Sequence, residues 1–93
     1  MMVINLGLAD NPLYTGCKIE EVAGRLNLVT DVTEAISIVG RNANKMEIDP
    51  DEVELTGPMA VWSYLIVFHA VVHRTRKVWY NDGRERYLVA KHG

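Results

Sequence analysis

Residues 59–72, MAVWSYLIVFHAVV, form an apolar run interrupted by Ser63 and His69. This stretch is too short for a membrane span, which takes about 20 residues, and too long for an ordinary strand. It therefore predicts a helix that is buried on most of its sides. Pro58 stands where proline often begins a helix, and Thr56 or Gly57 can cap it. In so small a chain, this helix needs a sheet on one face, and we expect another subunit on the other.

The segments on either side of this helix have the pattern of strands. Residues 53–55 alternate apolar and charged side chains, and residues 78–80 read VWY. Residues 81–84, NDGR, are typical of a tight turn, because Asn, Asp and Gly tolerate a positive φ. We expect the chain to return as a strand over residues 87–90.

The first half of the chain predicts a strand over residues 3–8, which ends in a turn over 9–12. Helical spacing of apolar residues predicts a helix over 18–27 with Thr15 as its cap, weakened by Gly24. Residues 28–39 are rich in β-branched side chains, so we expect a strand with its core at 35–39. A turn over 40–44, a short strand over 46–48 and a turn over 49–51 complete this half.

This order of elements predicts a fold of the α/β (α+β) class. We expect one compact domain over residues 1–93, in which two helices lie on a mixed sheet in a ferredoxin-like or related arrangement.

Composition narrows the class of protein. The 93 residues are 48% hydrophobic and 24% charged, which is typical of a globular domain and excludes disorder. Cys17 is the single cysteine, so an intramolecular disulfide and a cysteine-based zinc site are excluded. The net charge of −2 argues against a general binder of long nucleic acid. The first five residues carry no basic region, so we expect no secretory signal and a cytoplasmic protein.

The charges are unevenly distributed along the chain. Residues 1–56 have a balance of −6 and residues 57–93 a balance of +4. Such asymmetry favours an anionic partner, and a solvated basic face is the alternative.

Three histidines are candidates for chemistry. His69 and His73 are four residues apart and share one face of the predicted helix, a spacing that can chelate a metal, although no third ligand is evident. The alternative for His69 is a buried, hydrogen-bonded histidine, and for His73 a cation that favours the helix C-terminus. His92 lies beyond the last predicted strand.

Several residues of the C-terminal half can bind phosphate. Gly57 and Pro58 open the predicted helix, whose N-terminus offers free N–H groups, although a plain cap explains them equally well. Arg74, Arg84 and Arg86 can contact phosphate or remain solvated. Asp82 either serves chemistry or only shapes its turn. We expect the aromatic residues to belong to the core or an interface: Trp62, Tyr64, Phe68, Trp79 and Tyr80.

Residues 53–93 run from a strand ending in TGP, through the apolar helix to His73, then to VWYND and YLVAKH. In this order they resemble a small CRISPR-associated family of ring nucleases, single-domain relatives of the CARF sensors. The resemblance implies a CARF-related, ferredoxin-like fold, dimers or higher assemblies, and the use of Mn²⁺. It implies that His73 and Asp82 are catalytic, or Asn81 in an alternative register, and that Gly57, Pro58 and His92 bind the ligand.

The expected function is therefore the binding and cleavage of a cyclic oligoadenylate, such as cyclic tetra-adenylate, in type III CRISPR antiviral defence. In this hypothesis the ribose 2′-hydroxyl attacks the adjacent phosphate, His73 moves the proton, and Arg74, Arg84 or Arg86 stabilises the developing charge. Two alternatives remain open. One is a cyclic-nucleotide-binding module without turnover, and the other is a dimeric structural or interaction protein of cellular or phage origin.

Overall fold

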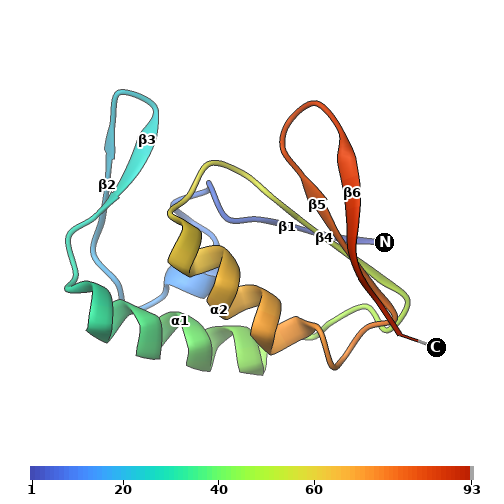
Figure 1. Cartoon of the computed structure of the whole chain (residues 1–93). Coiled ribbons are helices and arrows are strands. Elements are labelled where there is room, and N and C mark those ends of the chain that lie inside the picture. Colours follow the sequence, from blue (N-terminus) through green and yellow to red (C-terminus); the bar gives the residue numbers. More distant parts are fainter. Residues whose placement is uncertain (93) are drawn as a thin grey trace.

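Two sheets and two α-helices make up the computed structural model, which describes residues 1–92 (Figure 1). The main sheet has four strands in the order β1-β4-β5-β6, and a separate hairpin pairs β2 with β3. In chain order the elements are β1 (Met2–Asn5), η1 (Pro12–Tyr14), β2 (Ile19–Val22), β3 (Arg25–Leu28), α1 (Val32–Lys45), β4 (Glu52–Thr56), α2 (Val61–Val71), β5 (Lys77–Asn81) and β6 (Arg86–Lys91).

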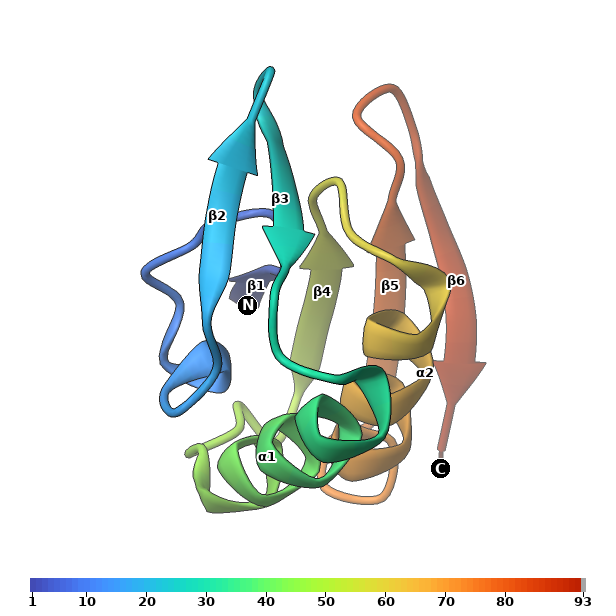
Figure 2. The ribbon, with the colours of Figure 1, turned by 90° about the vertical axis from the view of Figure 1, so that its left-hand side faces the viewer.

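The strands β1, β4 and β5 are parallel, and β6 is antiparallel to β5. The helix α1 connects β1 to β4, and α2 connects β4 to β5, so both connections step across the sheet in the same direction. Connections of one handedness that step in one direction place their helices on the same face. Figure 2 shows α1 and α2 together in front of the sheet. The expected α+β class, with a mixed sheet and two helices in one domain, is confirmed.

The core lies between the helices and one face of the sheet. Alternation along the strands directs Ile4, Val53, Leu55 and Val78 to this face, where all are buried. Side chains of both helices pack against them, among them Val39, Val67 and Val71.

The prediction of a helix over 18–27 is wrong, because this segment is the hairpin β2–β3. Ala23 and Gly24 both have positive φ, 53° and 77°, at the centre of its two-residue turn. Two positive values are characteristic of the turns that match the twist of a hairpin. Gly24 is therefore a turn residue rather than a weak point in a helix, and the apolar residues around it alternate along two strands.

The prediction of a strand over 28–39 is also wrong, and residues 32–45 form α1 instead. Asp31 caps this helix, since its carboxylate accepts hydrogen bonds from the N–H groups of Thr33 (3.1 Å) and Glu34 (3.4 Å). Its buried residues recur at helical spacing and overcome the β propensity of the segment: Ala35, Ile38, Val39 and Ala43. The predicted turn over 40–44 belongs to the same helix, and the predicted strand over 46–48 is irregular.

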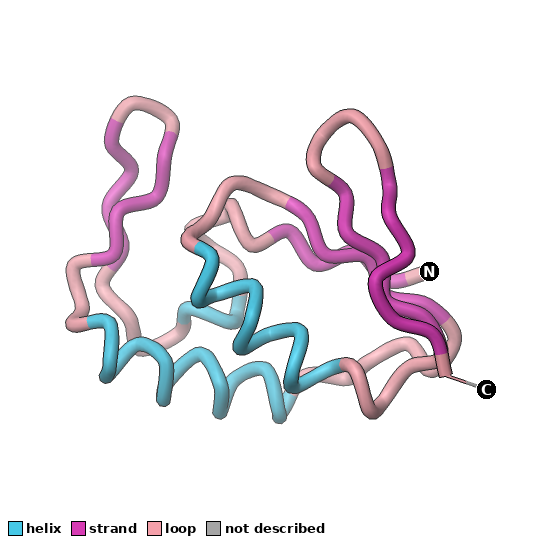
Figure 3. The backbone as a smooth tube through the Cα atoms, viewed as in Figure 1, coloured by secondary structure: helices cyan, strands magenta, loops and turns pink. Residues whose placement is uncertain are grey.

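The C-terminal half follows the sequence prediction (Figure 3). The strands expected at 53–55, 78–80 and 87–90 are β4, β5 and β6, and the apolar run forms α2. Its start differs from the prediction, because the N-cap is Ala60, without a side-chain bond, rather than Thr56 or Gly57. In residues 1–92, no helix combines the length and apolar character that crossing a bilayer requires.

Candidate functional site

The C-terminal ends of β1, β4 and β5 meet at one edge of the sheet, where open α/β sheets commonly bind ligands. The backbone N–H of Leu6 donates to Thr56 O at 2.7 Å, and the N–H of Gly7 donates to Asn5 Oδ1 at 2.9 Å. A hollow of about 360 Å³ opens at this edge. Its lining residues, here named the glycine edge, are Thr56, Gly57, Pro58, Tyr80, Asn81, Asp82 and Gly83.

Gly57 is fixed by the packing of two loops. Its φ is +101°, in the region that favours glycine, and a Cβ there would overlap Asn5 Oδ1 and lie 2.5 Å from Gly7 N. A Cβ on Gly7 would in turn lie 2.5 Å from Pro58 Cδ. The loops after β1 and β4 therefore touch through glycines, which accounts for Gly57 without a ligand. Sequence reasoning missed this contact, because it placed Gly7 inside a strand over 3–8, whereas β1 ends at Asn5.

The turn between β5 and β6 is built by two side chains. Asn81 Oδ1 accepts a hydrogen bond from the N–H of Gly83 at 2.8 Å. Asp82 Oδ1 accepts from the N–H groups of Glu85 (2.9 Å) and Arg84 (2.8 Å), and these bonds lower the pKa of the Asp82 carboxyl. This geometry gives Asp82 a turn-forming role, as a carboxylate at the tip of a hairpin.

The three histidines meet at the opposite edge of the sheet. The ring centres of His69 and His73 are 6.5 Å apart, and those of His73 and His92 are 6.2 Å apart. All three side chains are exposed, so within a single chain His69 is not the buried, hydrogen-bonded histidine of the alternative interpretation. His92 is held in place by its N–H, which donates to Arg76 O at 2.7 Å, directly after the pairing of Lys77 with Lys91. We name His69, His73 and His92 the histidine cluster.

Several residues next to the histidine cluster have basic side chains. Arg76 is exposed, and Lys77 and Lys91 are cross-strand partners next to it. Part of the positive excess of the C-terminal half therefore lies at this edge, together with the carboxylates of Asp51 and Glu52, which line one hollow with Arg76 and Lys77.

Two arginines expected to contact phosphate are engaged elsewhere. The Arg74 guanidinium donates to carbonyl oxygens of Ala43 (2.7 Å), Met46 (2.8 Å) and Ala70 (2.9 Å), so it caps the C-terminus of α1. Arg86 lies on the sheet face opposite the helices, where its Nε is 2.8 Å from Glu54 Oε1. Its guanidinium carbon is 4.1 Å from the ring centre of Trp79. Arg84, in the hairpin, remains exposed.

The predicted catalytic and ligand-binding residues are therefore divided between two ends of the molecule. His73 follows the C-terminal end of α2, whereas Gly57 and Asp82 lie toward its N-terminal end. The 11 residues of α2 rise about 1.5 Å each, which separates the two ends by about 16 Å. One chain thus brings His73 together with His92, but with neither Asp82 nor Asn81.

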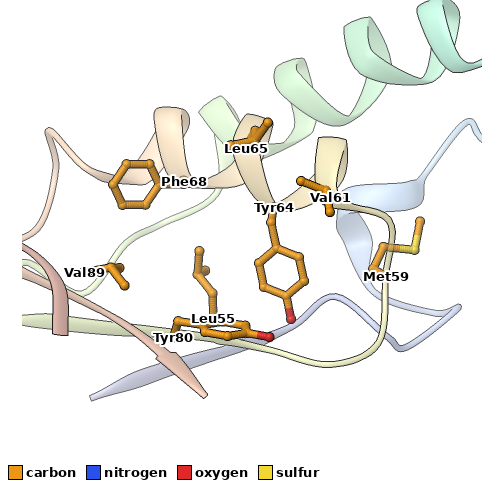
Figure 4. A pocket seen from close by; sticks show the side chains of 8 residues that line it. All are labelled: Leu55, Met59, Val61, Tyr64, Leu65, Phe68, Tyr80 and Val89. Carbon is orange, nitrogen blue, oxygen red and sulfur yellow. The ribbon is translucent and has the colours of Figure 1, made fainter. Parts of the chain in front are cut away.

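A third feature, an apolar cleft of about 370 Å³, lies between α2 and the strands β5 and β6 (Figure 4). We name it the α2 cleft. Tyr64 and Tyr80 meet edge to face in it, with ring centres 5.4 Å apart, and the Tyr64 hydroxyl donates to Gly57 O. Burial, and then the nearby Tyr80 and Tyr14, raise the pKa of Tyr64 to about 12. The cleft is lined by Leu55, Met59, Val61, Tyr64, Leu65, Phe68, Tyr80 and Val89.

The expected Mn²⁺ finds no ligand set within residues 1–92. These residues contain no group of three or more His, Cys, Asp or Glu side chains arranged to hold a metal ion. In the histidine cluster, His73 is the neighbour of both His69 and His92, and no chemical step is assigned to a metal here. Comparisons with protein families, with curated proteins and with solved structures found no match to this chain.

Proposed function

We propose that this protein binds and cleaves a cyclic oligoadenylate, with cyclic tetra-adenylate as the first substrate to test, as a cytoplasmic ring nuclease of type III CRISPR defence. The observation that carries the proposal is the approach of His73 and His92 to 6.2 Å between ring centres. The two residues are distant in sequence, exposed and adjacent to basic residues.

A pair of imidazoles suits the cleavage of a phosphodiester that has a neighbouring 2′-hydroxyl. A neutral imidazole accepts the proton of that hydroxyl as its oxygen attacks the phosphorus, and a protonated one donates a proton to the departing 5′-oxygen. The products are a 2′,3′-cyclic phosphate and a 5′-hydroxyl. Acid and base must each come within about 3 Å of the atom they serve, and rings 6.2 Å apart can flank one phosphate.

The structure leads us to assign the stabilisation of the phosphate charge to a cation that was not among the expected ones. Arg74 and Arg86 are held by protein partners, whereas Arg76 is exposed and its carbonyl accepts the N–H of His92. In the proposal Arg76 stabilises the charge that develops on the phosphate. The exposed position of the cluster also leaves access for a ligand as large as a nucleotide ring.

The second candidate function is capture of the ring without cleavage. The hollow of about 360 Å³ at the glycine edge favours it, because the exposed Arg84 directly follows its lining residue Gly83 and no histidine lines it in the described chain. In this function Gly57, Pro58, Asn81 and Arg84 form the ligand site, and the histidine cluster has no part in it.

The test is incubation with labelled cyclic tri-, tetra- and hexa-adenylate, with and without Mn²⁺, followed by chromatography. We expect one ring to be converted to a linear product. His73→Ala and His92→Ala should each slow conversion by about 100-fold or more, the usual contribution of an acid or base. Lys45→Ala, an exposed change at the end of α1, is the control and should keep full activity.

Each result is decisive. Unchanged turnover in His73→Ala or His92→Ala contradicts the assigned chemistry. Thermal stabilisation by one ring that Arg84→Ala abolishes, without conversion by the wild-type protein, supports capture instead. No conversion of any ring and no stabilisation by any ring contradicts both functions.

A further inference from the structure

The α2 cleft extends between the glycine edge and the histidine cluster. Tyr80 lines both the cleft and the hollow of the glycine edge. On the helix wall, Leu65 lines the cleft, and His69 follows it one turn further along α2. On the strand wall, Val89 of β6 lies three residues before His92. Both walls of the cleft therefore lead to the histidine cluster at one end, and Tyr80 joins the cleft to the glycine edge at the other.

The lining of the cleft is uncharged and rich in aromatic rings. It includes Tyr64, Phe68 and Tyr80, and within residues 1–92 no charged side chain lines it (Figure 4). A phosphate in such a place would lose its hydration without gaining a partner. The Tyr64 hydroxyl donates to Gly57 O, whereas Tyr80 is 37% exposed and can meet a ligand. This lining favours a flat, uncharged group with polar atoms at its edge.

The volume of the cleft fits a group of this kind. Its 370 Å³ lies near the lower end of the range for small-molecule pockets, which is about 300–1,000 Å³. This size suits one heterocycle rather than a whole ring of nucleotides. The rest of a larger ligand would lie outside the cleft, within reach of the exposed residues at its two ends.

We propose that the α2 cleft binds one adenine base of the cyclic oligoadenylate while the phosphate of the same nucleotide lies at the histidine cluster, an inference that rests on the proposed function. Proteins commonly hold the bases of single-stranded nucleic acid by stacking them on aromatic side chains. Here the rings of Phe68 and Tyr80 serve this purpose. A base held in the cleft fixes the orientation of the ligand, which His73 and His92 need in order to reach particular atoms of one phosphate.

The test compares two variants on opposite faces of β6. Val89 and Leu88 are 49% and 44% exposed, but Val89 lines the cleft and Leu88 pairs with Trp79 on the other face. The ligand is cyclic tetra-adenylate with 2′-O-methyl groups, which lacks the attacking hydroxyl and so stays intact during calorimetry. We expect Val89→Glu to weaken its binding by about 5- to 150-fold, the contribution of stacking one base. Leu88→Glu adds the same charge in water and should change the affinity less than about twofold.

A second variant and a second ligand separate base binding from a loss of folding. Val61→Glu enters the cleft from the helix wall, at the first residue of α2, where the helix dipole favours a carboxylate. It should weaken binding to a similar extent. The methylated ring of four uridylates presents smaller bases, so the wild-type protein should bind it more weakly. Both cleft variants should reduce this preference for adenine, whereas a partly unfolded variant would lose affinity for both rings alike.

Affinity that falls in the cleft variants but not in Leu88→Glu supports the proposal. Equal affinities of Val89→Glu, Val61→Glu and Leu88→Glu overturn it, and so does an unchanged preference for adenine in the cleft variants. A wild-type protein that does not bind the methylated ring of adenylates also overturns it. Binding of the methylated ring without cleavage of the native ring contradicts the ring-nuclease function alone, so the two failures are distinguishable.

Discussion

The contact between the loops after β1 and β4 makes a quantitative prediction for Gly57→Ala. A Cβ at this position overlaps Asn5 Oδ1 and lies 2.5 Å from the backbone nitrogen of Gly7, at a φ of +101°. The left-handed conformation costs an alanine about 1–2 kcal/mol. Forcing the two loops apart costs about 1–3 kcal/mol more, and loss of the bond from Gly7 N–H to Asn5 adds about 1 kcal/mol. We expect Gly57→Ala to lower the free energy of unfolding by about 3–6 kcal/mol.

Gly83→Ala is the matched control for this change. Gly83 has a φ of +96°, close to that of Gly57, but no atom lies within 4 Å of its added Cβ. It should therefore lose only the conformational part, about 1–2 kcal/mol. Urea unfolding of the two variants, followed by circular dichroism, measures the difference, which is the cost of crowding. A difference below about 0.5 kcal/mol would refute the reasoning, because it would mean that the loops separate freely.

Two further variants test contacts that hold the helices in place. Arg74→Met should lower the free energy of unfolding by about 2–4 kcal/mol, because it leaves the carbonyls of Ala43 and Met46 without a charged donor. Arg41→Met, an exposed change on α1, should cost under about 0.5 kcal/mol, and equal losses in urea unfolding would contradict the capping role. Since the pKa of Tyr64 is raised from 10 to about 12 in the folded chain, its contribution to stability is complete below pH 10. That contribution is lost between pH 10 and 12. Tyr64→Phe should therefore reduce the loss of stability at alkaline pH, measured by unfolding experiments over a pH series. An unchanged pH profile of stability would contradict the shift in the pKa of Tyr64.

The sequence predicted the C-terminal half of the fold well, because its patterns are strong. The apolar run of α2 and the NDGR turn each have one good structural solution. Between residues 18 and 45, helix and strand were exchanged, because helical spacing at 18–27 and β-branched residues at 28–39 outweighed two local signals. Those signals were Gly24, which supports the turn of a hairpin, and Asp31, which caps a helix with Glu34 in its first turn.

The sequence selected candidate residues but did not show how they are arranged. His73 and His92 do meet, but the sequence cannot show that the residues flanking α2 are held apart by the length of that helix. Arg74 and Arg86 show a second limit. An arginine near candidate site residues looks the same in sequence whether it meets a ligand, a helix end or a buried glutamate.

The two outermost strands of the main sheet, its edge strands, determine how folded copies can associate. One edge is β1, which has only four residues, and the other is β6. The register of β6 against β5 shifts at Val78 and Trp79, and the strand begins and ends with Arg86 and Lys91. Short, irregular and charged edges resist pairing with another strand. Growth of the sheet from chain to chain, which has no natural end, is thereby disfavoured. Association through side chains on closed surfaces, which ends at a fixed number of copies, is the route that the fold leaves open.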